Sequence, residues 1–240
     1  MSVVALALAL TSPRVPAADR HVAQPLDVGP FTAIDVNGNV EINLVQGDRE
    51  AVVVTAPPTT RARLRVRSSD GRLTIDTNQD KRGWWQRSEG RPTIDIHFRT
   101  LDTLRTSGAV RVRAATLKAP SLRVKASGAT TMKLDALDVA ALRFTGSGAV
   151  KSDIAGRANE QEVVLSGAGT YRARDLASST VSVSVSGAGN VVVQARDKLD
   201  ATISGAGAID YYGDPQVTRR VSGAGKIRQR SSTTTKPTSA

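Results

Sequence analysis

Glycine-rich tetrapeptides are the first residues in this sequence that could do chemistry. Gly-Ala-Gly comes directly after four serines, Ser166, Ser186, Ser204 and Ser222. Such a loop binds phosphate only when a helix begins immediately after it, because the free amide groups of the helix hold the anion. Here strand-like alternation follows instead, and after Lys226 a phosphate loop would carry serine or threonine where Ile227 stands. We therefore expect no nucleotide and no other cofactor.

Nucleophiles and paired acids are the next candidates. The serines cannot form a hydrolytic triad, because the chain has only two histidines, His21 and His97, and His97 lies in a strand-like run outside the glycine-rich segment. Carboxylates that cleave polysaccharides lie ~5 to 10 Å apart. Asp153 and Asp210 share one outward slot but stand three repeats apart, about 14 Å at a strand spacing of ~4.8 Å. They cannot act together.

A third acidic set follows successive serines by nine to eleven residues: Asp175, Asp197 and Asp214. These aspartates could form a column at the second turn of each repeat. Arg174, Arg196 and Lys198 lie beside them in the sequence, which favours solvated ion pairs. The chain has no cysteine, so disulfides, thiolate metal sites and cysteine nucleophiles are excluded. We expect no catalytic residue and no metal site.

These residues are carried by a repeat of about 19 residues. SGAV, SGAT or SGAG begins at seven serines with spacings of 20, 20, 19, 20, 18 and 18 residues. One, three and five residues before a serine the side chains are apolar, as in Val185, Val183 and Val181, and polar residues stand between them. The same alternation resumes five and seven residues after the serine. Each repeat is therefore strand, corner, strand and turn.

The small corner residues indicate stacking. If each coil lies ~4.8 Å from the next, every corner residue sits over its equivalent, where a bulky side chain would collide with its own copies. Glycine also adopts backbone angles that other residues resist. The sequence thus predicts an all-β fold, a parallel β-solenoid of about 18 to 20 residues per coil. Its structural corner comprises Ser107, Gly108, Ser127, Gly128, Ser147, Gly148, Ser166, Gly167, Ser186, Gly187, Ser204, Gly205, Ser222 and Gly223.

Four segments follow from the composition along the chain. Residues 1–18 hold an apolar run and a small-residue cleavage pattern, which predicts a signal peptide and export. Residues 19–105 form a β-rich, hairpin-rich N-terminal cap continuous with the solenoid, with one hairpin at Gln46–Arg49, between runs 40–45 and 51–55, and another at Ser68–Gly71. Residues 106–228 are the SGAG-repeat solenoid. Residues 229–240 lack apolar periodicity and are expected to be disordered.

An ordered set of motifs resembles a known family. It comprises Gly38-Asn39-Val40-Glu41-Ile42, Gln46-Gly47-Asp48, Asp70 to Ile75, Leu101 to Val112 and the SGAG series that follows. Over roughly residues 28 to 228 this set resembles the head GIN domain family of auto-transporter adhesins, a domain of unknown function. The resemblance implies an exported bacterial right-handed β-helix with a role in the cell envelope or in adhesion. It brings no catalytic residues.

Two groups of residues form the candidate binding surface. Both tryptophans lie in one basic stretch, with Arg82, Trp84, Trp85 and Arg87, where indoles beside cations could stack on sugars or cover the open end of the core. Arg123, Lys125 and Arg143 point outward from the early coils. The net charge of +11 attracts anionic polymers in a salt-dependent way. The candidate partners are an anionic envelope polymer, a glycan or another protein, without specific nucleic acid binding.

The sequence therefore predicts a non-enzymatic, exported β-solenoid. The apolar run of eight residues is too short to cross a bilayer, which takes ~20 residues, and no later segment is continuously apolar. We expect an adhesin-like or structural protein of the cell envelope, in the periplasm or at the cell surface. The alternative is a carbohydrate-binding or polysaccharide-processing β-helix.

Overall fold

The computed structural model describes residues 22–26, 28–77 and 91–231. Apart from the single-turn helix α1 (Pro58–Arg61), the regular elements of these residues are strands. They are β1 (Val22–Leu26), β2 (Ala33–Gln46), β3 (Ala51–Ala56), β4 (Leu64–Ser69), β5 (Arg72–Thr77), β6 (Thr93–Phe98), β7 (Thr103–Ala114), β8 (Leu117–Gly128), β9 (Thr131–Gly148), β10 (Lys151–Gly167), β11 (Thr170–Ala173), β12 (Leu176–Ala177), β13 (Thr180–Gly187), β14 (Asn190–Gln194), β15 (Lys198–Gly205), β16 (Ala208–Tyr212), β17 (Gln216–Ser222) and β18 (Lys226–Gln229).

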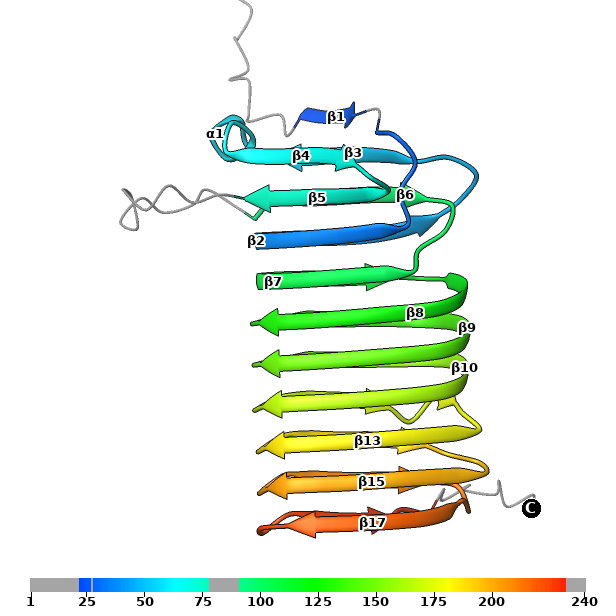
Figure 1. The fold of residues 1–240 in the computed structure, drawn as a ribbon. Coiled ribbons are helices and arrows are strands. Elements are labelled where there is room, and N and C mark those ends of the chain that lie inside the picture. The colour runs from blue at the N-terminus through cyan, green and yellow to red at the C-terminus, as the bar shows by residue number, and fades with distance from the viewer. Residues whose placement is uncertain (1–21, 27, 78–90, 232–240) are drawn as a thin grey trace, which may run out of the picture.

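The chain winds as a right-handed parallel β-solenoid, which confirms the predicted fold class (Figure 1). Equivalent residues of successive coils are paired in register, so that Ser147 lies between Ser127 and Ser166. We call the outer surface of the strands that lead into the serine corners the pre-corner face. It runs from β5 and the first half of β2 through β7, β8, β9 and β10 to β13, β15 and β17.

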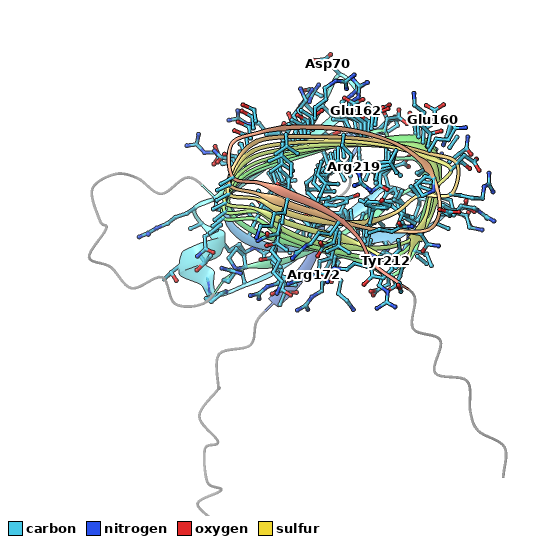
Figure 2. All side chains as sticks on the ribbon, turned by 90° about the horizontal axis from the view of Figure 1, so that it is seen from below. Asp70, Glu160, Glu162, Arg172, Tyr212 and Arg219 are labelled. Atoms are coloured by element: carbon cyan, nitrogen blue, oxygen red, sulfur yellow. The ribbon has the colours of Figure 1, made fainter. Side chains whose placement is uncertain are left out.

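The core lies inside a flattened oval section, which is seen end-on in Figure 2. The alternation sets its composition: Val181, Val183 and Val185 are all buried, and the serines between them are exposed. Few rings fill the interior, but Phe144 and Tyr171 pack at 4.9 Å between ring centroids. The predicted inward face of both strands is therefore confirmed.

The side chains at two inward slots, one residue before and three residues after each corner serine, point into the same part of the core. In the coil of Ser147 the slots hold Gly146 and Val150, whereas in the next coil they hold Leu165 and Gly169. A Cβ added to Gly146 would meet Leu165 Cδ2 at 2.7 Å, so the leucine of one coil occupies the space left by the glycine of its neighbour. The change from SGAV to SGAG along the chain thus reflects core packing.

The N-terminal region confirms one predicted hairpin and corrects the other. β4 and β5 pair antiparallel around Asp70 and Gly71, both with positive φ. β2 and β3 form no hairpin across Gln46–Arg49. Instead β6 lies between them, parallel to β2 and antiparallel to β3, and β1 pairs with the other edge of β3.

The solenoid already begins within the predicted cap. β2 pairs with β7 along twelve residues, and Gly38 lies in register with Gly108. At the other end β18 reaches Gln229, and Arg230 donates to Asp210. Residues 1–18, and residues 232–240 of the predicted tail, lie outside the described residues.

Candidate functional site

The serine and glycine corners are architectural, as the sequence predicts. The first glycine of each corner has a positive φ, between 75° at Gly128 and 128° at Gly205. A Cβ added to the first glycine of any corner from Gly108 to Gly223 would stand 2.6 to 3.0 Å from the carbonyl oxygen of the equivalent glycine in the preceding coil. Backbone pairing continues through the bend, since the amide of Ala149 donates to the Gly128 oxygen at 2.9 Å. The glycines of these corners hold the coils together through backbone contacts.

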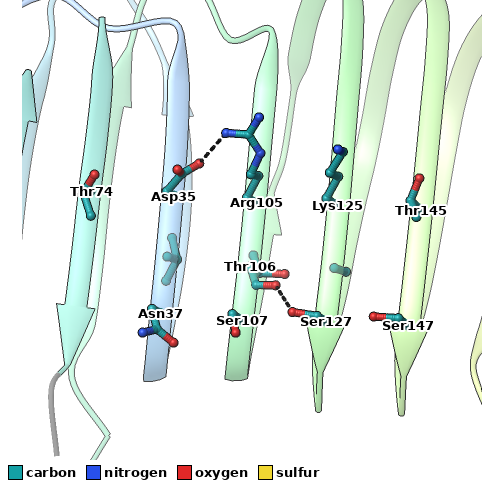
Figure 3. Close-up of a pocket in the computed structure, with 12 residues that line it drawn as sticks. Asp35, Asn37, Thr74, Arg105, Thr106, Ser107, Lys125, Ser127, Thr145 and Ser147 are labelled. Atoms are coloured by element: carbon teal, nitrogen blue, oxygen red, sulfur yellow. Dashed lines mark hydrogen bonds and ion pairs between the residues drawn. The ribbon is translucent and has the colours of Figure 1, made fainter. Parts of the chain in front are cut away.

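A hollow of about 460 Å³ lies on the pre-corner face beside this corner (Figure 3). Its wall is formed by Asp35, Val36, Asn37, Thr74, Arg105, Thr106, Ser107, Lys125, Ala126, Ser127, Thr145 and Ser147. The hydroxyl-bearing column at the corner has short side chains, while the neighbouring outward column carries Asp35, Arg105 and Lys125 (Figure 3). The difference in side-chain length opens the hollow. The corner side presents Asn37 and the serines, and the other side presents the charged residues flanked by Thr74 and Thr145.

A second hollow of about 400 Å³ lies at the other end of the same strands. Its lining is Asp102, Ser121, Leu122, Arg123, Ala141, Leu142, Arg143, Glu160, Gln161, Glu162, Thr180 and Ser182. All three described members of the predicted binding surface therefore lie on the pre-corner face: Lys125 lines the first hollow, and Arg123 and Arg143 line the second. The other four members, Arg82, Trp84, Trp85 and Arg87, fall outside the described residues.

The charges along this face are only partly neutralised. Asp35 pairs with Arg72 at 2.7 Å and with Arg105 at 3.3 Å. Arg143 pairs with Glu162 at 2.6 Å. Arg123 and Lys125 are exposed and pair with no carboxylate of the described residues. Arg123 lies in register beside Arg143, and Lys125 beside Arg105, so two pairs of like charge lie on adjacent coils.

The acidic candidates are held apart or neutralised. Arg172 and Val192 lie between Asp153 and Asp210 in the stack, and Arg172 pairs with Asp153 at 3.4 Å. The predicted column of Asp175, Asp197 and Asp214 does not form, because Asp197 lies in register with Ser179, whose carbonyl accepts its amide at 2.9 Å.

Arg196 neutralises Asp197 with two bonds of 2.9 Å, and this hydrogen bonding holds the pKa of the carboxyl below its ordinary value. Of the ion pairs expected beside these three aspartates, the structure shows this one, and Asp175 and Asp214 pair with no cation of the described residues. Within residues 22–26, 28–77 and 91–231, no group of three histidine, cysteine or acidic side chains is placed to hold a metal ion.

Several residues of the first hollow were missed by sequence reasoning. Asp35 and Asn37 lie in a coil whose corner reads Asn37-Gly38-Asn39 instead of Ser-Gly-Ala. The signal was present: Ile34, Val36 and Val40 repeat the apolar alternation around Gly38. A search for the alternation, rather than for the SGA letters, would have found this coil.

A known protein family matches most of this chain. The model of the family described as "Putative auto-transporter adhesin, head GIN domain" matches residues 30–215. The chain belongs to this family. Membership indicates an adhesin-like or structural role, and it associates this head GIN domain with the cell envelope or surface. No protein of curated function matches the chain.

Solved structures share the fold of this head GIN domain. A structure described as a putative adhesin from Bacteroides fragilis superposes with a TM-score of 0.82 at 22% identity, covering 87% of this chain and 96% of that chain. A second putative adhesin, from Parabacteroides merdae, gives a TM-score of 0.66 at 20% identity and covers 87% and 95%. A structure from Parabacteroides distasonis described as a putative lipid binding protein gives a TM-score of 0.63 at 20% identity and covers 87% of this chain and 96% of that chain.

The described part of this head GIN domain contains no helix that could cross a bilayer, since α1 has only four residues.

Proposed function

We propose that this chain is a non-enzymatic, exported protein of the cell envelope that attaches to a polyanionic polymer through its pre-corner face. The observation that carries the proposal is the pair Arg123 and Lys125. Both cations are exposed, both line hollows, and neither pairs with a carboxylate of the described residues. A polymer of acidic sugars or phosphodiesters would supply the missing counter-charge.

The arrangement of the coils supports a long, repetitive ligand. Arg105 stands beside Lys125, and Arg123 stands beside Arg143, at the ~4.8 Å spacing of paired strands. Like charges this close repel one another, so an anion that bridges them relieves the repulsion and releases its own counterions. The two hollows lie on one face, and a single extended chain can contact both.

The distribution of carboxylates favours binding over cleavage. Polysaccharide cleavage uses two acids within ~5 to 10 Å of each other, with pKa values that differ. In the first hollow Asp35 is the one carboxylate among the described lining residues, and it pairs with two arginines. The second hollow is lined by Asp102, Glu160 and Glu162, of which Glu162 pairs with Arg143. Asp35 and Glu162 therefore serve as partners of arginine side chains in this structure. Attachment without turnover is therefore the activity that we propose.

Binding of residues 19–240 to an acidic polysaccharide and to its neutral counterpart tests the proposal. We expect binding to the acidic polymer only, with affinity that falls steeply as salt rises. The double variant Arg123→Glu/Lys125→Glu should weaken binding by about tenfold or more. Lys151→Glu/Lys226→Glu is the matched control, because it makes the same charge change at two exposed lysines on the opposite strands.

Three results would contradict the proposal. Equal losses in both double variants would show that only net charge matters. Binding of the neutral polymer with unchanged affinity would instead support a lectin-like site. Release of shortened polymer in a depolymerase assay, with and without added divalent metal, would show that the protein is an enzyme.

A further inference from the structure

The last described coil breaks the rule that governs the inner face of all preceding coils. Three residues before the corner serine, the side chain points inward, and in six successive coils it is buried and apolar: Leu104, Val124, Phe144, Val163, Val183 and Ala201. In the final coil this position is Arg219, which is paired in register with Ala201. An arginine therefore occupies the slot that would form the core of the next layer.

Arg219 is held in this inward position by contacts to the preceding coil. Its guanidinium donates a hydrogen bond to the hydroxyl of Tyr211 and lies 5.5 Å from the centroid of the tyrosine ring. Figure 2 shows Arg219 within the oval outline of the solenoid, across its lower end. Ala201, the smallest residue of the column, is the in-register neighbour of Arg219. The buried Tyr211 hydroxyl gains the partner that its burial requires.

The end that Arg219 crosses is otherwise suited to association. Among the described residues, β17 pairs only with β15 and β18 only with β16, so each presents one free edge. Val221 is 48% exposed, and Val217 and Ile227 are only partly buried. A free, apolar parallel edge is a template for a strand from another chain, and natural sheets block such edges with inward-pointing charges.

The positive charge of the last coil also opposes the addition of a strand from another chain. From Gln216 to Arg230 the chain carries five cations and no acid: Arg219, Arg220, Lys226, Arg228 and Arg230. Arg228 and Arg230 pair with Asp210 of the preceding coil, whereas Arg219, Arg220 and Lys226 form no ion pair with a described carboxylate. In a two-fold contact between identical ends, the cations of one copy would face the cations of the other. Stacking on the N-terminal end of another copy would bring the same cations near Arg65 and Arg67 of β4, whose side chains are exposed.

We propose that Arg219 is a terminating residue, which prevents β17 of one molecule from receiving a strand of a second copy. The guanidinium would have to lose Tyr211 and enter a dry layer unpaired for stacking to occur, and burial of an unpaired charge is strongly unfavourable. Arg219 thus acts on assembly in addition to covering the core. This inference does not depend on the ligand of the pre-corner face.

The test is self-association of residues 19–240, measured by sedimentation over a concentration series together with hydrogen exchange of the β17 amides. We expect the Arg219→Val variant, which restores the side chain found at Val183, to gain mass with concentration and to protect β17. High salt should strengthen this association by screening the remaining cations. Arg219→Lys keeps the charge and should behave like the unmodified chain.

Arg220→Val is the matched control, because it removes the same charge at the adjacent outward position. Equal association of Arg220→Val would show that total charge, and not the inward arginine, keeps the ends apart. The proposal would also be overturned if folded Arg219→Val kept the mass of the unmodified chain up to the highest soluble concentration. Concentration-dependent protection of β17 in the unmodified chain would likewise refute it.

Discussion

Gly148 packs so closely on Gly128 that a Cβ added to Gly148 would stand 2.9 Å from the Gly128 carbonyl oxygen. The contact is with backbone, which cannot rotate away as a side chain can. Gly148 also has a φ of 89°, in the left-handed region that residues with a Cβ rarely adopt. Geometry and conformation therefore both require glycine at this corner.

Replacement of Gly148 by alanine should lower the free energy of unfolding by about 2 to 3 kcal/mol, from backbone strain and from the displaced coil. Urea unfolding followed by circular dichroism measures this loss. Gly47→Ala is the control, because nothing lies within 4 Å of a Cβ at Gly47. We expect the control to change stability by less than about 0.5 kcal/mol. Similar small losses in both variants would be inconsistent with tight stacking at the corner.

The shared space between Gly146 and Leu165 predicts non-additive substitutions. Gly146→Ala should destabilise, because its Cβ would meet Leu165 Cδ2 at 2.7 Å. Leu165→Ala should cost about 2 to 5 kcal/mol through lost burial and a cavity. In the double variant the new methyl group enters that cavity, so the total loss should fall short of the sum by about 1 kcal/mol. Strict additivity in a double-mutant cycle would show that the two slots are independent.

Asp210 predicts a pH dependence at the C-terminal end. Burial raises its pKa, but hydrogen bonds from Arg230 and Arg228 outweigh burial and hold the pKa below the ordinary value of 3.8. The folded state therefore favours the carboxylate. Its contribution to stability is complete above the unfolded-state pKa and is lost as the pH falls through the lower folded-state pKa.

Thermal unfolding of Asp210→Asn at neutral and acidic pH measures this contribution. The variant should be less stable than the unmodified chain at pH 7, and the difference should shrink as the solution is acidified below the ordinary aspartate range. Asp214→Asn serves as the control, because Asp214 is exposed and forms no ion pair with a described residue. A stability difference for Asp210→Asn that stays constant down to acidic pH would contradict the assignment.

Much of the fold follows from local pattern, because strict alternation determines which side of a strand faces the core. Val181, Val183 and Val185 could be placed inside from their spacing alone. The pairing order of β2, β6 and β3 could not be found this way. The turn residues at Gln46–Arg49 predict a local bend. They carry no information on β6, which lies some forty residues later in the sequence and pairs between β2 and β3.

The positions of the candidate binding residues could be predicted only in part. Arg123, Lys125 and Arg143 occupy regular outward slots, so their common face could be predicted. The hollow beside Lys125 depends on short hydroxyl side chains in several coils and on Asp35 from a coil with a different corner. The acidic column failed because the turns differ in length: successive serines are 20 residues apart at Ser166 and Ser186 but 18 apart at Ser186 and Ser204.

Because equivalent residues pair in register, the number of coils in the rod can change without altering the pairing within the coils that remain. Each middle coil rests only on the coil before it and the coil after it. Duplication of one whole winding between Ser166 and Ser186 would preserve every pairing at its two junctions, and the rod would grow by a single strand spacing. A single extra residue within a strand, rather than in a turn, would turn the apolar side chains that follow it outward. The length of the rod can therefore increase or decrease only in whole-coil steps.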